Sequence, residues 1–232
     1  MIRLAFLLLA GPLAAAPASE PAAHPVVGGL VRSREWLIRR APRREEEFLG
    51  DVSYRSGPDF FQSDWALFRH ETQSWQARGQ VRMEHLFVSG DRVDVRGQRA
   101  EFDQGSGRGQ LLPAPGERIT FTRRPAAGEP DHGSAGRVDW QGRSLIHLEG
   151  GIRVWGPRLD LRGGRGVYAS ESGELKVSGG RPVLRVLEGD WTGAVQADVV
   201  TGRRDPDSLR ADGKATGWIR FKDKDKLEKL AQ

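Results

Sequence analysis

The 232-residue chain contains no cysteine and no asparagine. Without cysteine the protein has no disulfide bonds, no thiol nucleophile and no cysteine-ligated zinc site. Without asparagine there is no N-glycosylation sequon, and Asp-Gly or Gly-Gly must supply the tight hairpin turns. Lysine is also scarce, with six residues beside 30 arginines, so arginine carries nearly all of the positive charge.

Recognisable catalytic motifs are missing as well. The sequence has no P-loop, no Gly-x-Ser-x-Gly elbow, no His-Glu-x-x-His and no EF-hand loop. The short run Gly105–Gly109 has no βαβ context and is interpreted as a turn. The five histidines, which are His24, His70, His85, His132 and His147, show no metal-ligand spacing. We therefore predict a protein that is not an enzyme and needs no metal or cofactor.

The net charge is +5 and the sequence pI is about 9.9. Such a balance favours anionic partners. Along the chain, however, arginine alternates with acidic residues, as between Arg92 and Glu101, which is equally typical of a mixed solvated surface. A nucleic-acid binder would need a concentrated basic stripe or stacking aromatics. We predict no nucleic-acid partner.

Residues 1–18 have the features of a secretory signal peptide. Arg3 precedes an apolar stretch over 4–16, and Ala16-Pro17-Ala18 fits a cleavage site after Ala18. The stretch is too short to span a hydrocarbon core of about 30 Å. We expect a periplasmic protein, with an uncleaved inner-membrane anchor as the alternative. Residues 19–47 are predicted to be a flexible leader, and 222–232 a charged tail.

From Phe48 onward, apolar and polar residues alternate with a period of two, broken by glycines. This pattern is typical of antiparallel strands with one solvated face. The segment 63–75 could pass for an amphipathic helix but is interpreted as strand-turn-strand, and 123–135 is predicted to be a Pro/Gly-rich loop between two halves. The sequence therefore predicts an all-β domain over 48–221, with a sandwich, jelly-roll or barrel architecture.

A degenerate repeat begins with a glycine followed by alternating residues. It starts at Gly50, Gly79 and Gly151, at spacings of 29 and 72 residues, and a further interval of 29 leads to Gly180. Each unit supplies about three short strands, and one unit cannot bury its apolar face alone. Stacked units would share a continuous interior.

These units resemble the OstA-like repeats of lipopolysaccharide-transport periplasmic proteins, LptA and LptC among them. The best match is Glu84–Val93 with Arg99–Asp103, and the resemblance covers about 48–221, interrupted over 104–135. It implies an elongated open β-jelly roll of two antiparallel sheets that binds the acyl chains of lipopolysaccharide, or a related anionic lipid, in an apolar groove. It also implies pairing of edge strands with other OstA-like proteins or with a second copy.

The resemblance and the alternation together predict the residues of this groove. The apolar lining is expected to be Val81, Met83, Val93, Val95, Phe102, Ile119, Phe121, Val138, Trp140, Ile146, Leu148, Ile152, Val154, Leu159 and Leu161. Phosphate contacts at the rim are expected from Arg82, Arg92, Arg153 and Arg158, for which exposed salt-pairing is the alternative. The alternative for the whole domain is a secreted structural or partner-binding β-protein with a closed, dry core.

Overall fold

The computed structural model describes residues 30–87, 90–142, 144–170, 172–189, 191–203 and 208–221. All regular structure in these ranges is β-strand, in antiparallel pairs, which confirms the predicted all-β class. The strands are β1 (Leu30–Arg32), β2 (Glu35–Arg39), β3 (Glu45–Ser56), β4 (Asp59–Arg69), β5 (Ser74–Leu86), β6 (Arg92–Asp103), β7 (Arg108–Leu112), β8 (Ile119–Arg124), β9 (Asp131–Gln141), β10 (Leu145–Trp155), β11 (Leu159–Gly163), β12 (Arg165–Ala169), β13 (Glu174–Ser178), β14 (Val183–Glu188), β15 (Trp191–Gln196), β16 (Val199–Arg203), β17 (Ser208–Asp212) and β18 (Thr216–Phe221).

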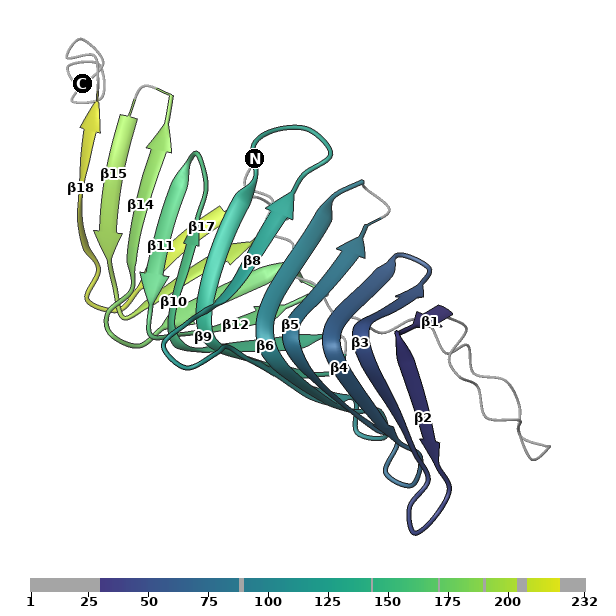
Figure 1. Ribbon diagram of the computed structural model, residues 1–232. Helices are drawn as coiled ribbons and strands as arrows, with labels where there is room; N and C mark the ends of the chain where they lie inside the picture. Colours follow the sequence, from purple (N-terminus) through teal and green to yellow (C-terminus); the bar gives the residue numbers. More distant parts are fainter. Residues whose placement is uncertain are drawn as a thin grey trace, which may run out of the picture.

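The strands form one sheet that is folded over into two layers, which we call the first and second arms (Figure 1). Long strands cross from one arm to the other, and their two halves have different neighbours. The N-terminal half of β6, for example, pairs with β8, and its C-terminal half pairs with β7. In the same way β10 pairs with β12 through its first half and with β11 through its second half.

The pairings define the membership of each arm. The first arm contains, in order, β1, the second half of β3, the first half of β4, the second half of β5, the first half of β6, β8, the first half of β9, the second half of β10, β11, β14, β15 and β18. The second arm contains β2, the remaining halves of β3 to β6, β7, the remaining halves of β9 and β10, and then β12, β13, β16 and β17.

Glycines with positive φ mark the line along which the sheet folds. Gly79 (φ 77°) lies where the β5–β6 register shifts between Arg78 and Val81. Gly150 (φ 72°) lies at the equivalent shift in β10. A bulge of this kind inserts extra backbone into one strand and bends it, and glycine adopts the left-handed conformation without a Cβ penalty. The repeat glycines Gly50, Gly79 and Gly151 all have positive φ, so the sequence repeat is the repeat of the fold line.

The fold line is held by recurring backbone hydrogen bonds. The Gly164 amide donates to the carbonyls of Ser178 and Gly179, at 3.1 and 2.8 Å. The Asp198 amide donates in the same way to Asp212 and Gly213, at 3.0 and 2.8 Å. These bonds satisfy carbonyls that the bulges remove from the regular ladder.

Strand β5 and its neighbour β4 confirm the strand-turn-strand interpretation of 63–75, because β4 ends at Arg69 and β5 begins at Ser74. Two other boundaries need correction. Within the predicted loop over 123–135, residues 123–124 belong to β8 and 131–135 to β9, so the connection covers only 125–130. The irregular stretch 104–135 contains β7 and β8, which together replace one long strand across the fold line.

The predicted flexible leader over 19–47 also needs correction from Leu30 onward. β1 and β2 both pair with β3, which itself starts at Glu45. The Trp36 ring on β2 stacks on Phe48, with centroids 5.8 Å apart, so this segment extends the sheet. The strand pattern was not recognised in this segment because most of its residues are charged. The predicted signal peptide, the rest of the leader and the C-terminal tail lie outside the described residues.

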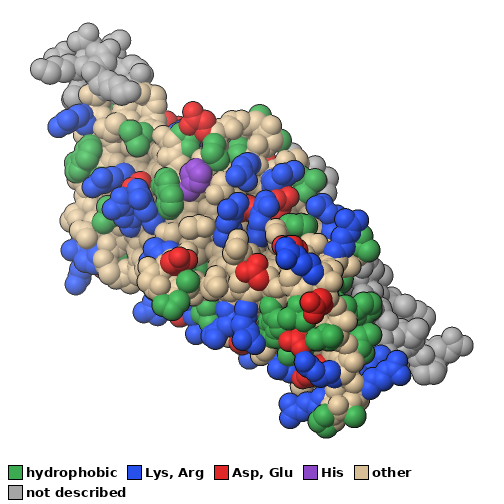
Figure 2. All heavy atoms as spheres, in the orientation of Figure 1, with side chains coloured by type: hydrophobic (Ala, Val, Ile, Leu, Met, Phe, Trp, Pro, Cys, Tyr) green, Lys and Arg blue, Asp and Glu red, His purple; other side chains and the backbone are tan. Residues whose placement is uncertain are grey.

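Each arm has an inward and an outward face. Inward residues from both arms form one core cluster along the fold line, including Val81, Ile119, Ala135 and Val177. The outward faces carry most of the charged side chains, and Figure 2 looks onto the outward face of the first arm. The apolar space between the arms, and the edges of that space, are therefore candidate functional sites.

Candidate functional site

All fifteen predicted groove residues lie on the inward faces. In the first arm Val95 stands opposite Met83 and Phe121, and in the second arm Val138 stands opposite Leu111 and Leu148. The alternation in the sequence was enough to predict that these side chains share a face, because a strand presents every second residue to the same face.

The exposure of the inward residues differs along the length of the molecule. Far from the fold line, inward residues from the middle of the molecule are fully enclosed: Leu161 is 3% exposed, Tyr168 3% and Leu175 1%. Between β3 and β9, the inward residues Val93 (1% exposed) and Phe121 (6%) are buried as well. Eight other inward residues of these strands are only partly buried: Tyr54, Phe61, Met83 and Val95 in the first arm, and Phe68, Trp75, Phe102 and Trp140 in the second arm. We call this second set the N-terminal interior face.

Aromatic rings dominate the second-arm side of that face. Trp75 packs against Phe68, at 4.7 Å between centroids, and against Phe48, at 6.1 Å. Phe102 and Trp140 stack at 6.3 Å, and Trp140 lies over Gly109, where no side chain would fit. Such rings provide a large apolar surface at low entropic cost. Tyr54, Phe61 and Phe68 were not among the predicted lining residues, although their alternation with polar neighbours signals the same face.

Charged side chains lie on the inward face near the free rim of the first arm. Arg123 continues the inward row of Ile119 and Phe121 and is 5% exposed. Its guanidinium donates to Asp91 at 2.7 Å and to Asp131 at 3.1 Å. Asp91 also accepts the Ala126 amide at 3.0 Å and so ties the connection 125–130 to the residue that precedes β6. This cluster was not predicted from the sequence.

Burial controls the electrostatics of this cluster. Burial raises the pKa of the Asp131 carboxyl, and the nearby Arg123 guanidinium only partly offsets it. Nε of Arg123 is buried without a hydrogen-bond partner among the described residues. Next to the cluster along the same row, Asp59 contacts His85 Nδ1 at 2.6 Å. The second arm has a comparable inward pair, Glu46 with His70, at 2.8 Å.

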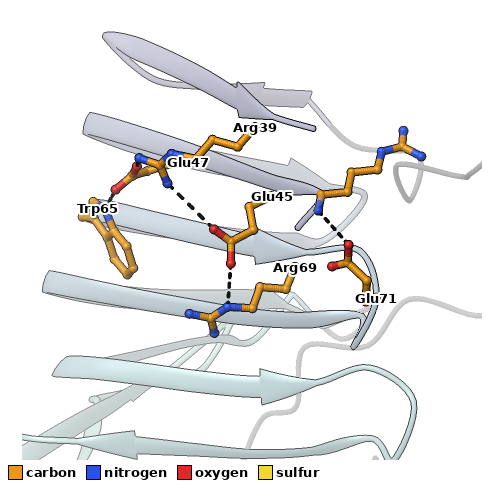
Figure 3. A network of polar contacts seen from close by, with 7 residues as sticks. Arg39, Glu45, Glu47, Trp65, Arg69 and Glu71 are labelled. Atoms are coloured by element: carbon orange, nitrogen blue, oxygen red, sulfur yellow. Dashed lines mark hydrogen bonds and ion pairs between the residues drawn. The ribbon is translucent and has the colours of Figure 1, made fainter. Parts of the chain in front are cut away.

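On the outward face of the second arm, Glu45 and Glu47 of β3 form ion pairs. Figure 3 shows Glu45 bound by Arg69, at 3.0 Å, and Glu47 bound by Arg39 and by the indole of Trp65, at 2.5 and 2.7 Å. The Trp65 hydrogen bond first, and then Arg39, lower the pKa of Glu47 despite the opposing effect of burial.

This shift predicts an acid-sensitive contribution to stability. Because the folded-state pKa of Glu47 is lowered, its contribution is present above the ordinary value of 4.5 and is lost as pH falls through the folded-state value. Glu47→Gln keeps an acceptor for Trp65 but removes the charge. In denaturant melts at several pH values, we expect this variant to be less stable by up to about 1 kcal/mol at neutral pH, with the difference shrinking in acid. A difference independent of pH would contradict the assignment.

The predicted rim arginines do not face the interior. Arg82, Arg92 and Arg153 point outward from the first arm, and each pairs with an acid of the same face. Arg158 lies exposed in the turn between β10 and β11. Their positions therefore favour the salt-pairing alternative for Arg82, Arg92 and Arg153, because a ligand between the arms would meet the opposite face of the strands.

Both ends of the folded sheet expose apolar side chains. Trp36 (58% exposed) and Ile38 (52%) lie on β2, and Trp218 (56%) and Ile219 (65%) lie on β18. Within the described residues, β1 and β2 pair only with β3, while β17 and β18 pair only with β16 and β15. Each end thus presents strands with an unpaired edge.

Among the described residues no three histidines or carboxylates gather closely enough to hold a metal ion. No helix in the same part of the chain is long and apolar enough to cross a membrane. No protein-family model matches the sequence, and no characterised protein matches it significantly.

Proposed function

We propose that the protein is a periplasmic carrier that binds the acyl chains of lipopolysaccharide, or of a related anionic lipid, between its two arms during transport to the outer membrane. The observation that carries the proposal is the N-terminal interior face. There, apolar side chains point between the arms and yet remain partly exposed, whereas equivalent residues in the middle of the molecule are enclosed.

Hydrophobic transfer gives the physical reason. Exposed apolar surface inside a fold is costly unless a ligand covers it, and each acyl CH₂ removed from water contributes about 0.8 kcal/mol. Met83, Val95 and Phe61 on one side, and Trp75 and Phe102 on the other, offer rows of side chains suited to flexible chains. Binding of this kind is non-covalent and needs no cofactor.

The arrangement of strands is compatible with the OstA-like resemblance. The sheet is folded along a line of bulges, and its long strands cross between the two arms. This arrangement supports the proposal of an open jelly roll. The unpaired strands at both ends would pair with another OstA-like protein or with a second copy and extend the interior from one molecule to the next.

The second candidate is a structural or partner-binding β-protein with a closed core. The enclosed middle of the interior, around Tyr168 and Leu175, favours it there. The two candidates predict different occupants for the N-terminal interior face: a lipid in one case and only protein or water in the other.

Site-specific photocrosslinking in cells tests the proposal. A photoreactive phenylalanine derivative at Phe102 or Trp140 is expected to form an adduct detectable by blotting for lipopolysaccharide. Tyr168 is the matched control, because it is aromatic and inward but enclosed, and Arg99 is an outward control. Folded variants that give no adduct at Phe102 and Trp140, or that give equal adducts at Arg99, would overturn lipid binding between the arms.

A further inference from the structure

The outward faces of the two arms differ in charge. In the first arm, ten arginines and three carboxylates point outward from the strands, a balance of +7. The arginines are Arg32, Arg55, Arg82, Arg92, Arg96, Arg124, Arg153, Arg162, Arg185 and Arg220, and the carboxylates are Glu84, Asp94 and Asp160.

In the second arm the outward cations are equally numerous but are matched by acids. Its ten cations are Arg39, Arg69, Arg78, Arg99, Arg108, Arg137, Arg165, Lys176, Arg203 and Arg210. Its nine acids are Glu35, Glu45, Glu47, Glu101, Asp103, Asp139, Glu149, Glu174 and Asp212, which leaves a balance of +1. The asymmetry therefore comes from the distribution of carboxylates.

The few acids of the first arm are already shared. Asp94 pairs with both Arg82 and Arg96, and Asp160 pairs with both Arg153 and Arg162. The third acid, Glu84, pairs with Arg82 and Arg92. Arg124, Arg185 and Arg220 are exposed and form no ion pair with any residue that the structure describes. Figure 2 shows basic side chains outnumbering acidic ones on this face.

Exposed apolar side chains accompany these arginines. Leu86 is 45% exposed, Leu187 51% and Trp218 56%, and all three point outward from the first arm. Leu86 lies opposite Arg92 on the neighbouring strand, and Leu187 follows Arg185 two residues along β14. Arginine beside leucine and tryptophan is typical of protein surfaces at the boundary between lipid headgroups and acyl chains.

We propose that the outward face of the first arm docks on the surface of a lipid bilayer that contains anionic headgroups. The excess of unpaired arginines supplies the long-range attraction, and Leu86, Leu187 and Trp218 supply shallow insertion at the interface. A nucleic acid would satisfy the arginines but offers no comparable apolar partner to the two leucines. The inference does not depend on what occupies the space between the arms.

Vesicle cosedimentation of the full chain tests this docking. Vesicles of phosphatidylcholine with about one third phosphatidylglycerol should bind the protein, and binding should weaken from about 0.1 to about 0.5 M salt. Arg124→Glu with Arg185→Glu and Arg220→Glu should weaken binding roughly tenfold or more. The matched control replaces Arg108, Arg165 and Lys176 of the second arm with glutamate and changes the net charge equally. These three cations form no ion pair within the described part of the chain. We expect the control to bind much more tightly than the first-arm triple variant.

Equal losses in the two triple variants would show that only net charge matters and would overturn a specific face. Failure of the unaltered protein to bind these vesicles, with tight binding to duplex DNA at the same salt, would assign the face to nucleic acid instead. Retention of the Phe102 adduct in the first-arm variant would separate docking on the bilayer from lipid binding between the arms.

Discussion

Replacing Asp91 with alanine is expected to lower the free energy of unfolding by about 3 kcal/mol. The Asp91 side chain is 1% exposed and accepts hydrogen bonds from the Arg123 guanidinium and from the Ala126 amide. Its removal leaves a buried guanidinium with Asp131 as its remaining acid partner, and loss of one partner of a buried ion pair costs far more than the pair itself contributes. Urea or thermal melts followed by circular dichroism measure the change.

Two further variants make this result specific. Asp212→Ala removes an ion pair with Arg210 in which the side chains are 42% and 78% exposed, so it should cost less than about 1 kcal/mol. Asp91→Ala combined with Arg123→Leu removes the stranded charge and should recover part of the loss. A cost for Asp91→Ala as small as that for Asp212→Ala would show that the Arg123 cluster is not a buried network.

Gly79→Ala is expected to be the second most damaging change, with a loss of about 2–4 kcal/mol. Two costs combine at this position. The backbone has φ of 77°, which non-glycine residues adopt with strain. In addition, a Cβ built there would overlap the Asp64 carboxylate and lie only 2.7 Å from the Asp64 Cβ on the neighbouring strand. Thermal melts of the purified variant measure the loss.

Gly142→Ala separates these two costs. Gly142 also has positive φ, at 60°, but no atom of the described residues lies within 4 Å of a Cβ built there. It should therefore show only the backbone cost, about 1 kcal/mol. Adding Asp64→Gly to Gly79→Ala should remove the steric cost at the fold line. If Gly79→Ala and Gly142→Ala were equally mild, close approach of strands at the fold line would not be a determinant of stability.

Local pattern was enough to predict the class of the fold and which apolar side chains share a face. Alternation in 81–95 or 146–161 reports directly which side chains share a face, because the period of a strand is fixed by its backbone. The glycines were harder to interpret. Gly79 and Gly150 look like turns between short strands, and in the structure they lie inside long strands that bend. A turn and a bulge use the same residue for the same conformational reason, so local sequence does not separate them.

Charged segments were the other source of error. The leader prediction failed from Leu30 onward because Glu45 and Glu47 look solvated in the sequence, whereas Arg69 and Arg39 bind them across neighbouring strands. The inward Arg123 was missed for the same reason, since its partner Asp91 lies 32 residues away. Pairing partners of this kind are fixed by strand register, which depends on the whole sheet.

The sequence by itself determined that this chain forms antiparallel strands, which residues point to a common apolar face, and where the fold-line glycines recur. Only the tertiary structure decided which half of each strand belongs to which arm. Because every long strand crosses the fold line, residues such as Arg92 and Arg99 stand close in sequence but lie on different arms. Basic and acidic residues alternate along the chain, but the fold distributes them over two outward faces. One face is strongly basic, and the other has nearly equal numbers of basic and acidic side chains.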